Sequence, residues 1–315
     1  MAARPTLVTP PSLTPLDILI GDYLASCRAR GLSRGTIEHA YSFSLKEIFA
    51  PWCAANEITD VSELTQRVLD RFTSHLYESG GRTGAPLSRH TSHTYIRHVR
   101  QFLNWAEKEG EETTNAKPQL PRLPRRVLDV LTRQEIDQLE GAASAERDKL
   151  IVRILADGGL RVGELCSLRV EDITRHDRGA LLKVRGKGDK ERLVPVRPEL
   201  ARRIERFAKY RPVDATGDRL FVSIRRGRGG TYDPLTPSGV GQLLRSLAYR
   251  AGLAKRVHPH LLRHSFATEA LRRGMNPIQL AQILGHSGLR MIESVYSHLN
   301  TTDAYEAMMR MLASD

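Results

Sequence analysis

The stretch VHPHLLRHSFATEALRRG, residues 257–274, begins with three histidines and Arg263 within seven residues and continues in a helical pattern. A buried helix does not need this much cationic charge at its start, so the cluster predicts an anionic partner. His260 and Arg263 are three residues apart and should point the same way from the helix. A guanidinium binds oxyanions through a planar fork of donors, and an imidazole transfers protons near neutral pH.

Three further stretches carry residues suited to the same chemistry. Arg161 follows a glycine pair in ADGGLRVGELCSL, with Glu164 one helical turn later, and the alternative interpretation is a weak surface ion pair. Lys187 stands in the glycine-rich segment RGKGDKER, where the alternative is a solvated turn lysine. His286 and Tyr296 lie in ILGHSGLRMIESVYSH.

The elements that must position these residues are mostly helices. TRQEIDQLEGAA begins a helix, since Thr132 and Glu135 form a capping box. RDKLIVRILADGG is a mostly apolar helix that two glycines end. ALLKVRGKGDKERLVPV alternates on both sides of its centre and predicts a β-hairpin with Lys187 at the tip. The fold class is therefore mostly α (α+β), with a small hairpin sheet.

The N-terminal part has only helical periodicity. Its apolar stripes are Ile37, Tyr41, Leu45, Ile48 and Trp52; Leu69, Phe72 and Leu76; and Ile96, Val99 and Leu103. Pro51 is expected to end or kink the first of these helices. Opposite the third stripe lie Arg89, His93, Arg97 and Arg100. This cationic stripe suits a DNA backbone or major groove, and the alternative is a plain solvated face.

The charge is concentrated in the second half of the chain. The net charge is +12, with a net of −1 in residues 1–112 and +9 in residues 129–315. Between them lies a segment with three prolines in seven residues, no acid and four basic residues, Lys117, Arg122, Arg125 and Arg126, which we interpret as an extended linker. Such an excess favours nucleic acid as the partner, and a solvated basic surface is the alternative.

A metal site, a disulfide framework and a membrane span are not indicated. Cys27, Cys53 and Cys166 are far apart and form no CxxC spacing, which fits a reducing cytoplasm. His260 and His264 have the i,i+4 spacing of a metal pair, but leucines stand between them where HExxH has its glutamate. No apolar run reaches the ~18 residues of a membrane span, and the N-terminus lacks an apolar signal core.

Taken together, these motifs resemble the tyrosine recombinase family, which includes phage integrases, Xer-type recombinases and Cre. The family pattern is an arginine, a hairpin lysine, His-x-x-Arg, a histidine within LGH and a tyrosine. It is met in order by Arg161, Lys187, His260, Arg263, His286 and Tyr296. The sequence around these residues is similar to the family as well, in the segments GLRVGEL, GKGDKERLVPV, HLLRHSFAT, LGHS and YSH. The step from His286 to Tyr296 is ten residues, one more than is usual, so Tyr305 is the alternative nucleophile.

The resemblance implies a site-specific recombinase that cuts and rejoins DNA through a 3′-phosphotyrosyl link and a Holliday junction. Arg161 and Arg263 would clamp the phosphate, His286 would add a hydrogen bond, and His260 would take the proton of Tyr296. Lys187 would protonate the leaving 5′-oxygen. The chemistry needs no ATP, metal or other cofactor.

The resemblance also implies the domain organisation. Residues 14–112 would be a helical core-binding domain, 113–128 a basic linker contacting DNA, 129–298 the catalytic domain and 299–315 a tail helix. About a dozen residues precede the first predicted helix, too few for an arm-binding domain, so we expect a simple recombinase on short core sites of double-stranded DNA.

The tail TTDAYEAMMRMLASD has apolar positions at helical spacing, and a helix this short must dock to be stable. The tail could dock on its own domain or, as the resemblance implies, on a neighbouring protomer. Docking on a neighbour predicts a homo-tetramer on DNA and argues against the first rival, a monomeric type IB topoisomerase. The second rival, a catalytically idle DNA-binding regulator, finds no support because every catalytic position is filled. We expect a cytoplasmic, nucleoid-associated protein, with room for an accessory directionality factor.

Overall fold

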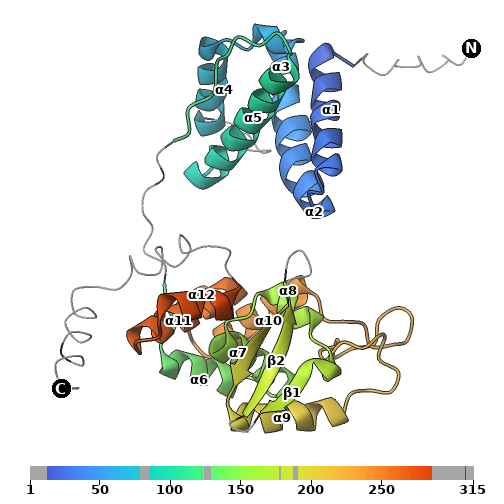
Figure 1. Cartoon of the computed structure of the whole chain (residues 1–315), viewed down its shortest axis with the longest axis vertical. Helices are drawn as coiled ribbons and strands as arrows, with labels where there is room; N and C mark the ends of the chain where they lie inside the picture. The colour runs from blue at the N-terminus through green and yellow to red at the C-terminus, as the bar shows by residue number, and fades with distance from the viewer. Residues whose placement is uncertain are drawn as a thin grey trace, which may run out of the picture. The chain divides into compact units, whose positions relative to one another are not determined.

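The structure is a computed structural model that describes residues 13–78, 85–121, 123, 129–176, 179–186, 191–285 and 309. The chain forms two compact units that divide between residues 125 and 126, and each is described by itself (Figure 1). The part of the chain described contains no helix long and apolar enough to cross a membrane.

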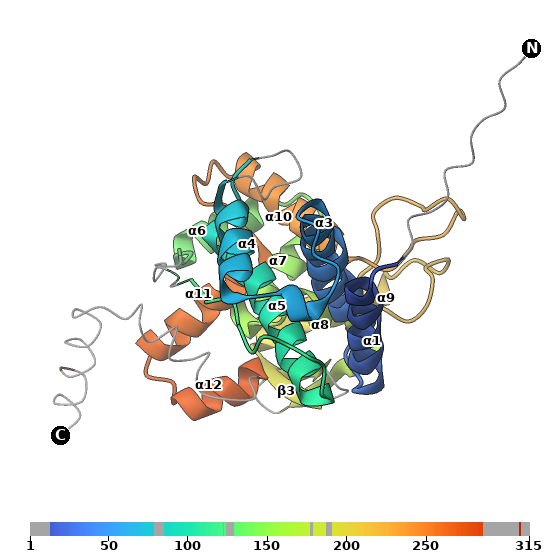
Figure 2. The same cartoon turned by 90° about the horizontal axis from the view of Figure 1, so that it is seen from above.

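Within the residues that the structure describes, every regular element of the first unit is a helix. Its elements are α1 (Pro15–Ala29), α2 (Arg34–Thr36), η1 (Ile37–Phe49), α3 (Ala50–Ala55), η2 (Val61–Glu63), α4 (Gln66–Glu78) and α5 (Arg89–Glu109). Helix α5 packs against α1, η1 and α4, and it lies between them in both views (Figures 1 and 2). The predicted apolar stripes face this core, with Leu69, Phe72, Leu76, Ile96 and Val99 fully buried. The helical prediction for this part is confirmed.

Of the two outcomes expected at Pro51, an end or a kink, the end does not occur. The helical path continues from Arg34 to Ala55, with Pro51 in the first turn of α3. A proline cannot donate the backbone hydrogen bond of its turn. The preceding segment η1 has wider turns, in which Ala50 N–H donates to the carbonyl of Leu45, five residues back. These wide turns let the chain pass Pro51 without breaking.

The second unit contains helices and one small sheet. Its elements are α6 (Arg133–Gly141), α7 (Glu146–Gly158), α8 (Val162–Ser167), η3 (Val170–Asp172), β1 (Ile173–His176), β2 (Gly179–Arg185), β3 (Glu191–Val196), α9 (Pro198–Lys209), α10 (Pro237–Arg250), α11 (Pro259–Arg272) and α12 (Pro277–Leu284). The predicted capping box at the start of α6 is present, because Thr132 and Glu135 bond each other's backbone N–H. The mostly α, α+β class is confirmed.

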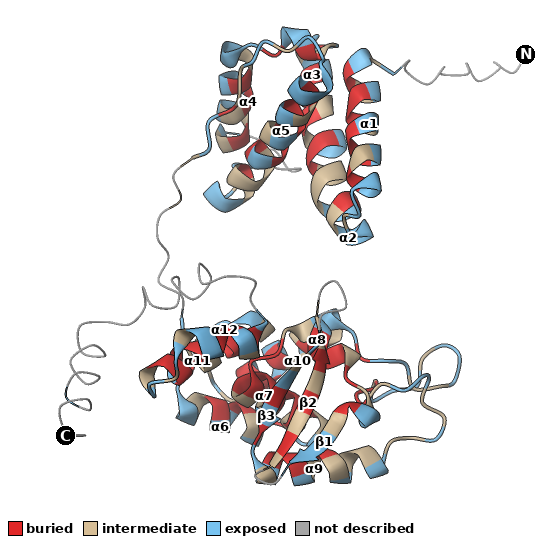
Figure 3. Ribbon diagram, viewed as in Figure 1, coloured by how far each residue is buried: buried red, intermediate tan, exposed pale blue. Residues whose placement is uncertain are grey.

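Helix α7 is the centre of this unit and contacts α6, α8, α9, α10, α11 and β3. The apolar run in its middle is buried, including Leu150, Ile151, Ile154 and Leu155, which explains the mostly apolar sequence at that point. The sheet has the antiparallel order β1-β2-β3, with Lys183 opposite Leu193 in the predicted hairpin. Alternate residues of β2 are buried against the helices (Figure 3). Strand β1 was not predicted, and it extends the hairpin to three strands.

The first residues of the expected linker pack on the first unit. Thr114 Oγ1 donates to the carbonyl of Leu64 at 2.6 Å, and Lys117 forms an ion pair with Glu107 at 3.0 Å. The charge of Lys117 is therefore used within its own unit, and Arg122, Arg125 and Arg126 lie outside the described residues.

Candidate active site

A glycine pair at the end of α7 brings three helices together. Gly159 ends α7 with a left-handed backbone, φ +62°, which a glycine adopts without strain. A Cβ at this position would lie 2.4 Å from Cδ1 of Phe266 and 2.9 Å from Cδ2 of Leu284. The missing side chain therefore lets the end of α7 contact α11 and α12 directly.

Arg161 stands at the N-cap of α8, two residues after Gly159. Its backbone N–H donates to Glu164 Oε2 at 2.7 Å, and its Nη1 donates to Glu164 Oε1 at 2.9 Å. The guanidinium also reaches the end of α12, where Nη2 donates to the carbonyl of Gly285 at 3.1 Å. Its side chain is 38% exposed, so a ligand in solution can reach it.

Arg263 reaches the same place from α11 but is almost enclosed, with 8% of its side chain exposed. Nη1 donates to the carbonyl of Gly159 and Nη2 to the carbonyl of Leu284, both at 2.6 Å. Burial lowers the pKa of Arg263 to about 10, nearby Arg161 adds to the shift, and Glu164 opposes it. The guanidinium is nevertheless charged at neutral pH.

The two arginines converge on one oxygen. Arg161 Nη1 donates to the carbonyl of Leu284 at 3.4 Å, and Arg263 donates to the same carbonyl. Carbonyls at the end of a helix lack intrahelical partners and attract cations. Gly285, left-handed with φ +65°, then ends α12 immediately before His286. The LGH motif is thus directly connected to both guanidiniums.

Glu164 is a buried carboxylate between the arginines. The ion pair with Arg161 that was considered from the sequence is present at 2.9 Å, but its carboxylate does not lie on the surface. Only 5% of it is exposed, and Arg263 Nη1 lies 4.0 Å from its Oε2. Burial raises the pKa of Glu164, but hydrogen bonds from Arg192 and the Arg161 backbone outweigh it, so the pKa lies below its usual value. The carboxylate is ionised and bound on both oxygens.

Sequence reasoning missed Arg192. It lies on β3, and its two Nη atoms donate to the two carboxylate oxygens of Glu164 at 2.8 and 2.7 Å. A signal existed, because Arg192 alternates with Val194 and Val196, which are both buried. An arginine on the buried face of a strand predicts a buried acidic partner.

The histidines of α11 have different environments. His258 is the N-cap residue, and its Nδ1 accepts from the Leu261 backbone N–H at 3.2 Å. His260 is exposed at the first turn, three residues before Arg263. His264, one turn after His260, is half-buried. Among the described residues, no group of three or more His, Cys, Asp or Glu side chains is arranged to hold a metal ion.

Three predicted catalytic residues, Lys187, His286 and Tyr296, lie outside the described residues, as does Tyr305. Strand β2 ends before Lys187 and strand β3 begins after it, and Gly285 directly precedes His286. The structure therefore brings together Arg161 and Arg263, and it positions the chain on both sides of the lysine.

The predicted DNA-facing residues of α5 avoid the core of the first unit. Arg89 and Arg97 are exposed, and His93 and Arg100 are half-buried. Arg100 Nη1 donates to the carbonyl of Pro118 at 3.5 Å, a long bond. Burial and the nearby Arg97 lower the pKa of His93.

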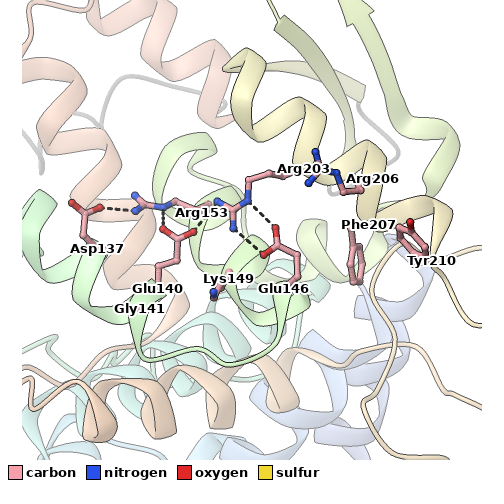
Figure 4. Close-up of a pocket in the computed structure, with 10 residues that line it drawn as sticks. All are labelled: Asp137, Glu140, Gly141, Glu146, Lys149, Arg153, Arg203, Arg206, Phe207 and Tyr210. Atoms are coloured by element: carbon pink, nitrogen blue, oxygen red, sulfur yellow. Dashed lines mark hydrogen bonds and ion pairs between the residues drawn. The ribbon is translucent and has the colours of Figure 1, made fainter.

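A separate cavity of about 830 Å³ lies over α6, α7 and α9 (Figure 4). Arg153 bonds Asp137 and Glu140, and Arg203 bonds Glu140 and Glu146 at 2.8 Å each. Arg153 and Arg203 are thus neutralised by carboxylates of the same wall. Of the predicted catalytic residues that the structure describes, Arg161, His260 and Arg263, none lines this cavity.

The chain is similar in sequence to known proteins over most of its length. The model of the phage integrase family matches residues 129–303. The tyrosine recombinase XerA of Pyrococcus horikoshii is 36% identical over 210 residues, which are 67% of this chain and 70% of that protein. A tyrosine recombinase of Thermosipho africanus is 31% identical over 299 residues, 93% of this chain and 98% of that protein.

Solved structures show the same fold. The crystal structure of XerA recombinase shares 28% identity and covers 94% of this chain and 98% of that chain, with a TM-score of 0.52. The Tn1549 transposon integrase in complex with transposon right end DNA is 20% identical over 93% of this chain and 99% of that chain, with a TM-score of 0.72. The chain therefore belongs to the phage integrase family and is a tyrosine-type site-specific recombinase.

Proposed function

We propose that the chain cuts and rejoins double-stranded DNA at short core sites through a 3′-phosphotyrosyl intermediate and a Holliday junction. The observation that carries the proposal is the convergence of Arg161 and Arg263 on the carbonyl of Leu284, next to His286. The solved XerH recombinase is bound to its difH substrate, and the lambda integrase structures contain a core site. Double-stranded DNA with a core site is the corresponding substrate here.

The two arginines act on the phosphate as it is attacked. Attack on a phosphodiester places additional negative charge on the non-bridging oxygens. Arg161 and Arg263 are already held by Glu164 and by backbone carbonyls, so they lose little freedom when the phosphate binds. Preorganised donors of this kind stabilise the transition state more than the ground state. His286 adds a further hydrogen bond to the same phosphate.

Proton transfer is assigned to the remaining residues. The phenol oxygen of Tyr296 attacks phosphorus while its proton passes to His260, which is exposed to solvent at the start of α11. The bond to the 5′-oxygen breaks, and Lys187 protonates that oxygen. The phosphotyrosyl ester retains the bond energy, so a 5′-hydroxyl can reverse the step without ATP or metal.

DNA is held by both units and the linker in this proposal. Residues 14–112 form the core-binding domain, 113–128 the linker, 129–298 the catalytic domain and 299–315 the tail. Arg89, His93, Arg97 and Arg100 of α5 face the DNA. Lys117 pairs with Glu107, so its charge is already used within the protein. The phosphate contacts of the linker therefore come from its other basic residues, Arg122, Arg125 and Arg126.

The C-terminal tail, residues 299–315, is the segment through which protomers would assemble. Met309 is 47% exposed in the single chain, and the surrounding tail sequence is rich in methionine. Docking on a neighbouring protomer would cover this apolar surface and close a homo-tetramer on two DNA sites. An accessory directionality factor and association with the nucleoid fit the same activity.

The test of the proposed chemistry is covalent trapping on a nicked suicide substrate. The parent protein should form a protein–DNA adduct that survives denaturation, and Tyr296→Phe should bind DNA without forming it. Tyr305→Phe is the matched control and should trap DNA normally. An adduct with Tyr296→Phe that Tyr305→Phe abolishes would move the nucleophile to Tyr305.

A further inference from the structure

Arg192 connects three separate parts of the active-site region through one guanidinium. It belongs to β3, the strand that follows the Lys187 hairpin. Its two Nη atoms bind both carboxylate oxygens of Glu164 on α8, and its Nε donates to the carbonyl of Ile283 on α12 at 2.6 Å. Only 11% of its side chain is exposed, so these bonds are largely shielded from water.

The guanidinium of Arg192 also fits directly against Gly285. A Cβ at Gly285 would lie 3.0 Å from Nη1 and 3.2 Å from Cζ of Arg192. The residue before His286 is therefore in contact with Arg192 on one side. Lysine could not replace these contacts, since an ammonium cannot bind two carboxylate oxygens and a carbonyl in one plane.

Arg192 also determines how strongly Glu164 holds the arginine clamp. The carboxylate receives four short bonds, two from Arg192 and two from Arg161. Without Arg192, its nearest cations would be Arg161, at 2.9 Å, and Arg263, at 4.0 Å. A buried carboxylate that loses a partner attracts the cations that remain. The guanidinium of Arg161 would then be drawn toward Glu164 and away from a phosphate.

We propose that Arg192 is a positioning residue for strand cleavage, which neutralises Glu164 and joins the Lys187 hairpin to the clamp and to the turn before His286. The inference rests on the proposed function, since it assumes that Arg161 and Arg263 bind the scissile phosphate. Arg192 itself does not touch the DNA in this account. Its loss should slow the chemical step and leave DNA affinity nearly unchanged.

The experiment compares single-turnover cleavage of a suicide half-site with equilibrium binding of the same DNA. Arg192→Gln and Arg192→Lys should each cleave about 10- to 100-fold more slowly, the size of effect expected when a reacting group is displaced by about 1 Å. Half-site affinity should remain within about threefold, because no phosphate contact is removed. Two substitutions are used so that a folding defect specific to one is recognised by its thermal unfolding.

Arg185→Gln is the matched control. Arg185 lies on β2 of the same hairpin, is 26% exposed and pairs with Asp172, another buried carboxylate, at 2.8 Å. It has the same type of ion pair without a bond to Glu164 or α12 among the described residues. Arg185→Gln should therefore destabilise the sheet but cleave at nearly the parent rate.

A double-mutant cycle identifies the route of the effect. In the Glu164→Gln background, Arg192→Gln should slow cleavage by a much smaller factor, because the carboxylate that Arg192 neutralises is gone. The inference would be overturned if Arg192→Gln slowed cleavage by the same factor in the parent and in the Glu164→Gln protein, or if Arg192→Gln cleaved at a near-normal rate. Arg161→Ala separates the two proposals: if Arg161→Ala itself cleaves normally, the phosphate clamp is wrong and the proposed function fails first.

Discussion

Arg161 and Arg263 donate to one carbonyl oxygen, that of Leu284, from two different helices, at 3.4 and 2.6 Å. The guanidiniums thus cap the C-terminal end of α12, where helix carbonyls are without intrahelical partners. The residue two positions after Leu284 is His286. The same interaction therefore holds the arginines near each other and places Leu284 and Gly285, the first two residues of the LGH motif, beside them.

Gly159→Ala should destabilise the catalytic unit by about 2–5 kcal/mol, since a left-handed alanine costs ~1–2 kcal/mol and overpacking adds ~1–3 kcal/mol. The added Cβ would lie 2.4 Å from Phe266 Cδ1. Gly252→Ala is the control, because Gly252 has φ +67° and nothing within 4 Å of its Cβ position. Thermal unfolding should show a clearly smaller loss there, and equal losses would mean that the contact with Phe266 is unimportant.

Arg97→Ala should weaken half-site binding and lower the slope of log affinity against log salt by about 1. Arg97 is exposed on α5, on the side away from the buried residues. Arg34→Ala is matched to it as an exposed arginine of the same unit, paired with Glu38 at 2.7 Å. Fluorescence anisotropy over a salt series measures the half-site affinity of both variants. Identical slopes for the two variants would show that Arg97 of α5 does not contact the DNA.

Cleavage should persist in EDTA. Two guanidiniums already supply positive charge at the phosphate, and a lysine is assigned to the leaving oxygen, so the proposed step needs no Lewis acid. Adduct formation on a suicide substrate with and without EDTA measures this. Complete loss of adduct that a divalent ion restores would refute the metal-free step.

Deleting residues 302–315 should leave half-site binding nearly intact while weakening cooperative filling of a full site and abolishing strand exchange. The apolar surface of the tail would no longer dock on a neighbour. Met309→Lys is the milder variant, since Met309 is 47% exposed, and it should show the same pattern more weakly. Gel-shift titrations on half and full sites would contradict trans docking if cooperativity and recombination were unchanged.

Local patterns predicted most of the helices and the hairpin because burial follows the period of each element. Ile96, Val99 and Phe72 are buried where their helical spacing places them. Strand β1 could not be predicted, since three of its four residues are exposed and it is held mainly by backbone pairing with β2. The passage through Pro51 depends on wide turns upstream that no local propensity indicates.

The candidate site was predictable in part. Arg161, His260 and Arg263 stand out by residue type and spacing, but the burial of Glu164 and its link to Arg192 arise only where α8, β3 and α12 meet. A sequence shows neighbours along one element, whereas these partners are 28 residues apart. Tertiary contact alone determines which carboxylate holds the clamp.

The central claim is that Arg161 and Arg263 bind the scissile phosphate through bidentate donors in the transition state. Single-turnover cleavage by Arg161→Lys and Arg263→Lys, measured beside half-site affinity, tests it most directly. Each variant should cleave about 10²- to 10³-fold more slowly while binding the half-site within about threefold of the parent, because an ammonium keeps the charge but not the fork. Near-normal cleavage by either lysine variant would contradict the account.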